Sequence, residues 1–391
     1  MHIGLDGIPL TETRAGVGHY TFELARALAL VSPTDEFELA YPSRYAPVRL
    51  ADDIAAPPLP PNLRASRVAV GVVGRHWWSI GLPRYIRRRR LELFHGTNYD
   101  VPLWHACPTV LTIHDLAYLI HPETHIARRV RRARRRLPLM TRTADMIITP
   151  TESVRGEVCE RLGVNPSKVV AVPEAPRRIF SPLAAHQTIE TRRRLLDGHE
   201  DAFLLAVGTI EPRKNLTTLL RAFEEWTQQN SSPQPTLRLV LVGDKGWLTD
   251  EFFASVAASR VRELIHFTGY ISDADLRALY SSCTAFIYPS IYEGFGLPVL
   301  EAMACGAPVV ASRIASIAET AGQHAARLFA PDDAHALARL IHELVNDVET
   351  RTRLSRDGQQ HAARFTWERA ARLTLDVYKE AKQRRAKAAL A

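Results

Sequence analysis

Short apolar runs rich in β-branched residues alternate along the chain with longer segments of helical periodicity. In the first half these runs are HIGLDG, FELAYP, RASRVAV, LELFHG, TVLTIHD, MIITPT and VVAVPEA. In the second half they are FLLAVGT, LRLVLVGD, LIHFTGY, AFIYPS and PVVAS. Amphipathic patterns such as NLTTLLRAFEEW, with Asn215 placed to cap it, fall between them. The alternation predicts an α/β chain of two doubly wound, Rossmann-like domains facing across a cleft.

A polar segment at residues 181–201, SPLAAHQTIETRRRLLDGHED, separates the two sets of strands and carries no strand signal. We interpret it as a linker region between an amino-terminal domain, residues 1–180, and a carboxyl-terminal domain, residues 202–366. Residues 367–391 have the pattern of a long amphipathic helix and are a candidate brace for the two domains. Ligands of such sheets bind beyond the carboxyl ends of the strands.

Composition narrows the class of protein. The 391 residues exceed one ordinary core, and 46% hydrophobic with 24% charged residues is typical of a folded chain. No stretch approaches the ~18 uncharged apolar residues of a membrane-spanning helix, and the start MHIGLDGIPL lacks the pattern of a signal peptide. The four cysteines form no CxxC pair, which argues against a disulfide framework or a structural zinc site. We expect a cytoplasmic protein.

Positive charge is concentrated between residues 75 and 142, in the runs YIRRRRLE and ARRVRRARRRL. Seven arginines within residues 128–136 cannot share one helix face, so some line a broad surface. An anionic inner-membrane surface is one partner for such arginines; a solvated basic face with two buried tryptophans is the alternative. Nucleic acid is not expected, because no groove-reading motif accompanies the charge. The candidate membrane and acceptor contacts are Trp77, Trp78, Arg87, Arg88, Arg131 and Arg135.

A glycine-containing turn follows the first predicted strand and opens a helix. Gly16 and Gly18 would let backbone amides approach a phosphate, although an ordinary tight turn explains them as well. The dinucleotide-binding fingerprint requires a small residue where Thr21 stands, which weakens an oxidoreductase interpretation.

Two loops of the carboxyl-terminal half place cations directly after predicted strands. VGTIEPRKNL carries Arg213 and Lys214, and VLVGDKGW carries Lys245. Arginine can grip a diphosphate through its planar fork and lysine acts on it as a point charge. Either loop alone could be a solvated basic loop, but cations at two neighbouring strand ends favour an anionic ligand.

In the stretch EGFGLPVLE, the carboxylates of Glu293 and Glu301 flank a loop in which two glycines leave the backbone amides accessible. Pro298 suits the first turn of a helix, which puts Leu297 near its start and Glu301 one turn in. Glu293 and Glu301 can accept hydrogen bonds from vicinal hydroxyls, while the amides beside Gly294 donate to oxygens. This mixture suits a polyol phosphate such as a nucleotide sugar. Alternatively, Glu301 only complements the helix dipole.

A possible metal motif has a simpler explanation. Asp273 and Asp275 form a D-x-D pattern, but ISDADLRALY is typical of a helix capped by Ser272 with acids in its first turn. We therefore expect no catalytic metal, since cationic side chains and amides can neutralise a departing diphosphate.

Several motifs occur together in the order of one enzyme family. VGTIEPRKNL, VLVGDKGW, FTGYISDADLRALY and SIYEGFGLPVLEAMACG follow the amino-terminal glycine loop and the pair His114-Asp115 at the end of TVLTIHD. On these motifs, which span essentially the whole chain, the sequence resembles the retaining glycosyltransferases of family 4, with the GT-B fold. It is most similar to bacterial mannosyltransferases of polysaccharide and O-antigen assembly.

The resemblance implies the reacting groups. Glu293 would contact the donor sugar, and His114 would lie at the sugar. Arg213 and Lys214 would hold the diphosphate and stabilise charge on the leaving group. Many relatives carry an arginine directly after the glycine of this strand, where this chain has Thr209 after Gly208. The diphosphate would therefore be held by Arg213 and Lys214, and which of the two contacts which phosphate stays open. For His114, a purely structural position is the alternative.

The resemblance also implies the donor and its contacts. Glu301 would accept hydrogen bonds from the ribose, Tyr270 would border the base, and the loop amides would hold sugar hydroxyls. The expected donor is GDP-mannose, with no cofactor, and the expected acceptor is a polyprenyl-diphosphate-linked glycan. Other nucleotide sugars, or an epimerase or hydrolase activity, are the alternatives. The donor-binding candidates are Gly16, Gly18, Lys245, Tyr270, Phe295, Gly296, Leu297 and Glu301.

Overall fold

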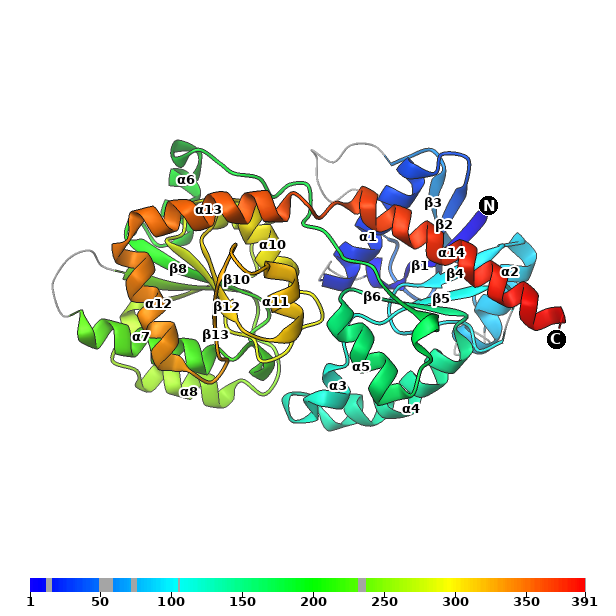
Figure 1. Ribbon diagram of the computed structural model, residues 1–391, viewed down its shortest axis with the longest axis horizontal. Helices are drawn as coiled ribbons and strands as arrows, with labels where there is room; N and C mark the ends of the chain where they lie inside the picture. The colour runs from blue at the N-terminus through cyan, green and yellow to red at the C-terminus, as the bar shows by residue number, and fades with distance from the viewer. Residues whose placement is uncertain (12–15, 49–58, 72–75, 105, 231–236, 391) are drawn as a thin grey trace. The chain divides into compact units, whose positions relative to one another are not determined.

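The computed structural model describes residues 1–11, 16–48, 59–71, 76–104, 106–230 and 237–390. The chain forms two compact units (Figure 1). The first unit consists of Met1–Leu116, Arg131–Glu174 and Thr366–Ala391. The second consists of Ala117–Val130 and Ala175–Phe365. Each unit is built around its own parallel sheet, as the alternating pattern predicts.

The first unit contains a seven-stranded sheet with the order β3-β2-β1-β4-β5-β6-β7, in which all described neighbours are parallel. The order reverses between β1 and β4, which creates a topological switch point at the carboxyl edge. Its strands are β1 His2–Asp6, β2 Glu36–Pro42, β3 Leu63–Val68, β4 Leu93–Gly96, β5 Thr109–Thr112, β6 Met146–Thr149 and β7 Val169–Ala171. Its main helices are α1 Gly16–Val31, α2 Leu82–Arg89, α4 Ala127–Thr143, whose first residues belong to the second unit, α5 Glu152–Leu162 and α14 Trp367–Leu390.

The second unit contains a six-stranded parallel sheet with the order β10-β9-β8-β11-β12-β13 and a switch point between β8 and β11. Its strands are β8 Ala202–Val207, β9 Leu237–Val242, β10 Ile265–Gly269, β11 Ala285–Tyr288, β12 Val309–Ser312 and β13 Arg327–Phe329. Its helices are α3 Ala117–Ile120, α6 Ala185–Leu195, α7 Leu216–Gln229, α8 Asp250–Ala258, α9 Asp273–Ser282, α10 Leu297–Ala304, α11 Ala315–Ala321, α12 Ala334–Asn346 and α13 Val348–Ala362.

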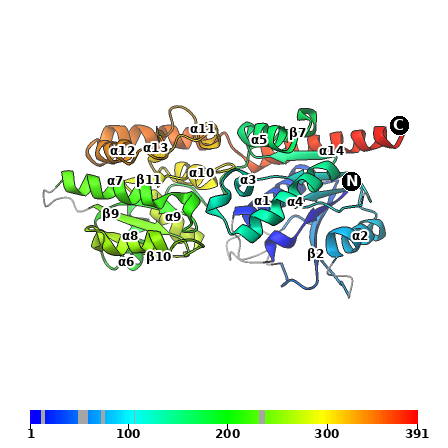
Figure 2. The same ribbon diagram turned by 90° about the horizontal axis from the view of Figure 1, so that it is seen from below.

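Both faces of the second sheet are covered by helices, which explains the continuous apolar runs in its strands. Adjacent residues of β8 enter different cores: Leu205 packs with residues of α9 and α10, and Leu204 packs with residues of α7 and α12. Figure 2 shows helices of this unit on both sides of its strands. The carboxyl edge of the sheet is thereby held on a rigid, two-sided core.

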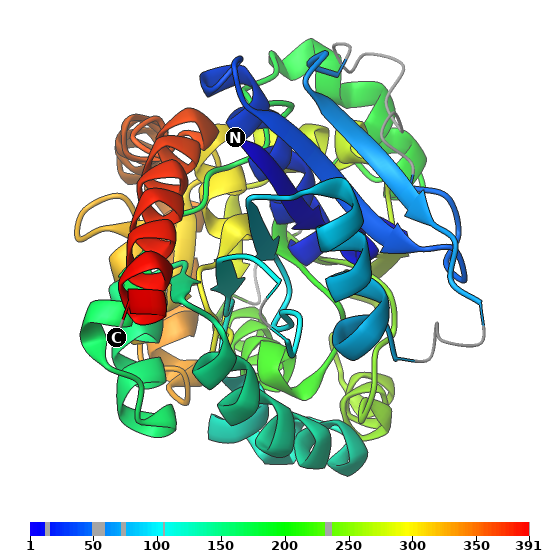
Figure 3. The ribbon, with the colours of Figure 1, turned by 90° about the vertical axis from the view of Figure 1, so that its right-hand side faces the viewer.

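The last helix belongs to the first unit. Trp367 and Tyr378 of α14 are buried, and the Tyr378 hydroxyl lies 2.8 Å from Nδ1 of His95 in β4. The helix also packs along α1 (Figures 1 and 3). The Trp367 ring lies 6.1 Å from that of Tyr20 in α1. The segment predicted to brace two domains therefore completes the core of one.

The unit boundary also differs from the predicted linker at residues 181–201. The chain passes to the second unit between Glu174 and Ala175, and α6 of the predicted linker packs against α9. Every predicted strand is present, and β13, the three-residue segment RLF, was not predicted. Among the described helices, none is long and apolar enough to cross a membrane.

Candidate active site

Loops at the carboxyl ends of three neighbouring strands carry the charged residues of the second unit. Strands β9, β8 and β11 lie side by side and run in parallel, so their carboxyl ends meet at one edge. The loop after β8 contains Arg213 and Lys214 in a short 3₁₀ turn, Pro212–Lys214. The loop after β11 contains Glu293. The structure therefore brings these sequence-predicted residues together.

Glu293 is buried and holds both cations. Its Oε2 accepts a hydrogen bond of 2.7 Å from Nη1 of Arg213, and its Oε1 accepts one of 2.6 Å from Nζ of Lys214. Nη2 of Arg213 also donates to Glu211 at 2.7 Å, and Nζ of Lys214 donates to the Tyr288 hydroxyl at 3.0 Å. The arrangement is a carboxylate clamped by a guanidinium and an ammonium at the edge of the sheet.

Electrostatics keeps this clamp ionised. Burial alone would raise the pKa of Glu293, but Arg213 and Lys214 offset it and lower the pKa to about 2. Burial lowers the pKa of Lys214, and Glu293 opposes that shift. A ligand that brings further negative charge would meet two cations already fixed in place, which is how charge that develops in a reaction is stabilised.

Backbone contacts position the clamp. Asn215 adopts a left-handed conformation, with φ of 53°, and its side-chain amide donates to the carbonyls of Pro289 and Pro331 at 3.0 and 2.7 Å. The amide of Ile291 donates to the Arg213 carbonyl, and the Ser316 hydroxyl donates to the Glu293 carbonyl at 2.6 Å. The loops after β8 and β11 are thus tied to each other independently of the charged side chains.

Helix α10 begins directly after Gly296, which has φ of 94°. This left-handed conformation favours glycine, and a β-carbon here would in addition displace Cδ1 of Ile317, from which it would lie 2.4 Å away. Pro298 lies in the first turn, as predicted, and Leu297 is the first helical residue. Phe295 is buried, and its ring lies 6.0 Å from that of Phe365. The predicted amide donors thus belong to a tightly packed turn at the start of the helix.

Glu301, in the second turn of α10, is also buried and paired. Its Oε1 accepts a hydrogen bond of 2.7 Å from Nε of Arg177. Burial raises the pKa of Glu301, and Arg177 opposes the shift. Arg177 could not be predicted, because no motif or spacing connects it with Glu301, 124 positions away in the chain.

Two predicted donor-binding residues are exposed at the same edge of the sheet. The backbone of Lys245 bridges to Ile210, but its ammonium contacts Asp250 at 3.1 Å and the Phe253 ring at 5.0 Å. Tyr270 follows β10 with a 60% exposed side chain, and its amide donates to Asp244 at 3.2 Å. These contacts are made with residues other than those of the Glu293 clamp.

The predicted residues of the first unit lie at the carboxyl edge of its own sheet. Gly16 and Gly18 are in the first turn of α1, and the preceding residues 12–15 of the predicted loop are outside the described part of the chain. His114 follows β5; its Nε2 donates to the Thr97 carbonyl at 2.8 Å and its Nδ1 lies 3.2 Å from Glu174. Burial opposes the charged ring, but Glu174 raises the pKa of His114 above its ordinary value. Both ring nitrogens face acceptors, so these contacts favour the protonated ring.

The membrane contact predicted for Trp77 is wrong, and that predicted for Trp78 stays a prediction. Trp77 is 1% exposed and packs with Leu82 and Ile86 of α2, while Trp78 is partly buried with its ring 6.4 Å from that of Phe94. The run before α2 is apolar because it forms a core, which was the alternative interpretation.

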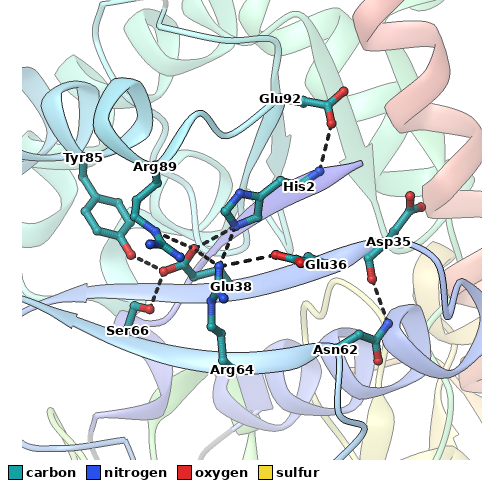
Figure 4. A network of polar contacts seen from close by, with 10 residues as sticks. All are labelled: His2, Asp35, Glu36, Glu38, Asn62, Arg64, Ser66, Tyr85, Arg89 and Glu92. Atoms are coloured by element: carbon teal, nitrogen blue, oxygen red, sulfur yellow. Dashed lines mark hydrogen bonds and ion pairs between the residues drawn. The ribbon is translucent and has the colours of Figure 1, made fainter.

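The arginines of α2 divide between two environments. Arg89 lies 3.3 Å from the buried Glu38, which also accepts hydrogen bonds from Tyr85 and Ser66 and contacts His2 and Arg64 (Figure 4). In contrast, Arg87 and Arg88 are exposed.

The arginines of α4 divide in the same way. Arg131 and Arg135 are exposed, Arg136 pairs with Asp100, and Arg129 lies over the ring of Trp247 at 5.3 Å. Of the predicted surface contacts, the four arginines therefore remain accessible.

The D-x-D sequence is a helix start, as predicted. The Ser272 hydroxyl accepts a hydrogen bond from the Asp275 amide at 3.1 Å and caps α9. Asp273 pairs with Arg177 and Asp275 pairs with Arg194.

Two Rossmann-like units, each with its own parallel sheet, make up the GT-B fold. The crystal structure of Anabaena Alr3699/HepE in complex with UDP and glucose has this fold, with a TM-score of 0.73 at 17% identity over 97% of this chain and 99% of that one. The family model described as Glycosyltransferase Family 4 matches residues 14–175, and that described as Glycosyl transferases group 1 matches residues 187–361. The chain belongs to the family 4 glycosyltransferases.

Two curated relatives come from Escherichia coli. O-antigen chain mannosyltransferase B is 28% identical over 383 residues, which cover 95% of this chain and 97% of the relative. The serotype-specific mannosyltransferase WbdA is 31% identical over 297 residues, which cover 73% of this chain but 35% of that longer protein.

Proposed function

We propose that this glycosyltransferase moves mannose from GDP-mannose to a polyprenyl-diphosphate-linked glycan, with retention of anomeric configuration, in the synthesis of a bacterial cell-surface polysaccharide. The observation that carries the proposal is the clamp of Glu293 between Arg213 and Lys214 at the carboxyl edge of the second sheet. The similarity to two mannosyltransferases supports the choice of sugar.

In the proposed reaction the bond between the anomeric carbon and the diphosphate oxygen breaks, and the acceptor oxygen bonds to the same face of that carbon. The departing phosphate oxygen takes the acceptor hydroxyl proton, so the products are a glycoside and GDP. Arg213 and Lys214 stabilise the charge on the leaving diphosphate. Glu293 orients the sugar and opposes the positive charge at its anomeric carbon, without forming a covalent bond to it.

The donor is tested by thermal unfolding with GDP-, UDP- and dTDP-sugars. A bound donor stabilises the folded state by RT ln(1 + [L]/Kd), about 2.7 kcal/mol at a hundredfold excess over Kd. GDP-mannose should give the largest shift in Tm. A larger shift with another nucleotide sugar would replace mannose in the proposal, and no shift with any of them would reject it.

Transfer is separated from epimerase or hydrolase activity by incubating the enzyme with GDP-mannose alone. A transferase should turn over little donor until a lipid-linked glycan acceptor is added. NMR of the product then gives the anomeric configuration, and an inverted product would overturn the retaining assignment.

The site is tested with Lys214→Ala and Glu301→Ala, with Lys379→Ala of α14 as the control because Lys379 is exposed and pairs with Asp376. At sub-saturating donor each site variant should lose about 10²-fold in transfer rate. A wild-type rate in either variant removes that residue from the site.

We also propose that the exposed arginines of α2 and α4 hold the enzyme at an anionic membrane surface beside its acceptor. Basic residues near such a surface contribute about 1 kcal/mol each. Replacing Arg87 and Arg88 with serine should reduce co-sedimentation with anionic vesicles at low salt, whereas replacing the exposed Arg260 and Arg262 of the second unit should not. Absence of wild-type binding to those vesicles rejects attachment through the arginines.

A further inference from the structure

We propose that Arg177 is a positioning residue that fixes the Glu301 carboxylate for a ribose and thereby makes the site select ribonucleotide over deoxyribonucleotide donors. The proposal rests on the proposed function, in which Glu301 meets the donor nucleotide. Arg177 lies in the segment between β7 and α6, outside the motifs that carry the other site residues.

Arg177 is held on three sides. Its Nε donates to Oε1 of Glu301 at 2.7 Å, and its Nη1 donates to Oδ2 of Asp273 at 2.6 Å. Its guanidinium carbon lies 4.6 Å from the centre of the Phe180 ring. Two carboxylates and a ring together fix both the position and the plane of the guanidinium, which a single ion pair would not do.

The fixed guanidinium constrains Glu301. Arg177 and Glu301 are 8% and 4% exposed, so neither side chain can exchange its partner for bulk water without local rearrangement. Oε1 of Glu301 is occupied by Arg177, and none of the described residues donates a hydrogen bond to Oε2. The carboxylate is thus oriented with one oxygen committed to the protein and the other left for a ligand.

Charge gives Arg177 a second effect on the same group. Burial raises the pKa of Glu301, and the neighbouring Asp273 raises it further, while Arg177 opposes both. Arg177 therefore favours the ionised carboxylate, which accepts hydrogen bonds and donates none.

Because Oε2 of ionised Glu301 can only accept hydrogen bonds, it favours ligands that place a hydroxyl donor against it. A ribose offers two vicinal hydroxyls, and a 2′-deoxyribose lacks one of them. A site built to bind a hydroxyl disfavours the analogue without it, because the buried acceptor is left unpaired. A hydrogen bond to a charged group corresponds to about 10- to 100-fold in affinity. The site should therefore disfavour dTDP-sugars.

The experiment is calorimetric titration of the full chain with GDP and with 2′-deoxy-GDP, together with UDP and 2′-deoxy-UDP. Wild type should bind the ribonucleotide of the preferred base about 10-fold or more tighter than its 2′-deoxy form. In Arg177→Met this preference should fall to about twofold, with a raised KM for donor and a kcat within a few-fold of wild type. Arg177→Lys should retain an intermediate preference, because an ammonium can pair with Glu301 but lacks the planar fork.

Arg178→Met is the matched control, because Arg178 is the exposed neighbour in the same segment. It should keep the wild-type preference. If Arg177→Met does not fold, Asp273→Asn removes the second anchor of the guanidinium and should lower the preference while Arg177 stays in place.

The outcomes separate this inference from the proposed function. If wild type binds none of the four diphosphates, the proposed function fails. If wild type binds a ribonucleotide but shows no preference over its deoxy form, or if folded Arg177→Met keeps that preference, the positioning by Arg177 is wrong while the proposed function stands.

Discussion

Each of the two sheets is associated with a buried glutamate surrounded by cations, and the two glutamates differ in where they lie along their strands. Glu38 is the third residue of β2, and its partners come from β1, β3 and α2 (Figure 4). Glu293 lies in the loop after β11, and its cationic partners come from the loop after β8. Burial raises the pKa of both carboxyls, but hydrogen bonds and cations offset it and lower both to about 2.

The pKa values of Glu38 and Glu293 are therefore lowered to the same extent although the two carboxylates have different partners. Glu38 accepts hydrogen bonds from Ser66 and Tyr85 as well as from Arg89, so its oxygens are saturated within the fold. Glu293 relies on two cations at the strand ends, where ligands of such sheets bind. A perturbed carboxyl marks a functional site only when its position in the fold also does.

The largest effect is expected for Glu293→Gln. Transfer should fall about 10³-fold in kcat, because the charge opposite the anomeric carbon is lost. Affinity for nucleoside diphosphate should be retained, because Arg213 and Lys214 remain. Steady-state kinetics and calorimetry measure the two quantities, and a wild-type kcat would place Glu293 with Glu38 as a structural group.

Glu38→Gln should act on stability alone. The neutral amide weakens the pairing with Arg64 and Arg89, whose side chains are 46% and 38% exposed, and it also weakens the hydrogen bonds from Ser66 and Tyr85. The free energy of unfolding should therefore fall by about 2 kcal/mol. Urea unfolding measures the change, and kcat measured well below the midpoint should equal that of wild type. A large loss of kcat in a folded variant would contradict the distinction.

Lowering the pH should gradually remove the contribution of ionised Glu38 to the free energy of unfolding. Because the folded-state pKa of Glu38 is lowered to about 2, its stabilisation is present above the unfolded pKa near 4.5 and is lost as the pH falls towards 2. Between pH 7 and pH 3.5 the gap in unfolding free energy between wild type and Glu38→Gln should narrow by about 1.4 kcal/mol. A constant gap would show that Glu38 does not titrate as its contacts indicate.

The smallest effect is expected for Tyr85→Phe, which removes one hydrogen bond to Glu38 and keeps the ring. The free energy of unfolding should fall by about 1 kcal/mol. Arg84→Ala, at an exposed position of α2, is the control and should change it by less than about 0.5 kcal/mol.

Much of this fold could be predicted because parallel strands that are buried on both faces are apolar along their whole length. The runs that end at Gly208 and Gly243 have this composition. The strand β13 could not, because Arg327–Phe329 is too short for periodicity to register. That Arg213, Lys214 and Glu293 lie close together could be predicted, because each stands in a loop directly after a recognisable strand. Arg177 was not, because its partners Glu301 and Asp273 are set by folding rather than by spacing.

The packing of α14 has a consequence for biosynthesis. The first unit needs Trp367 and Tyr378 for its core, yet these residues leave the ribosome after the whole of the second unit. The second unit is complete once Phe365 has emerged, so during translation it can finish folding ahead of the half that precedes it. Until α14 has been synthesised, the amino-terminal part of the chain cannot complete its core, and the surface that α14 covers stays exposed to solvent.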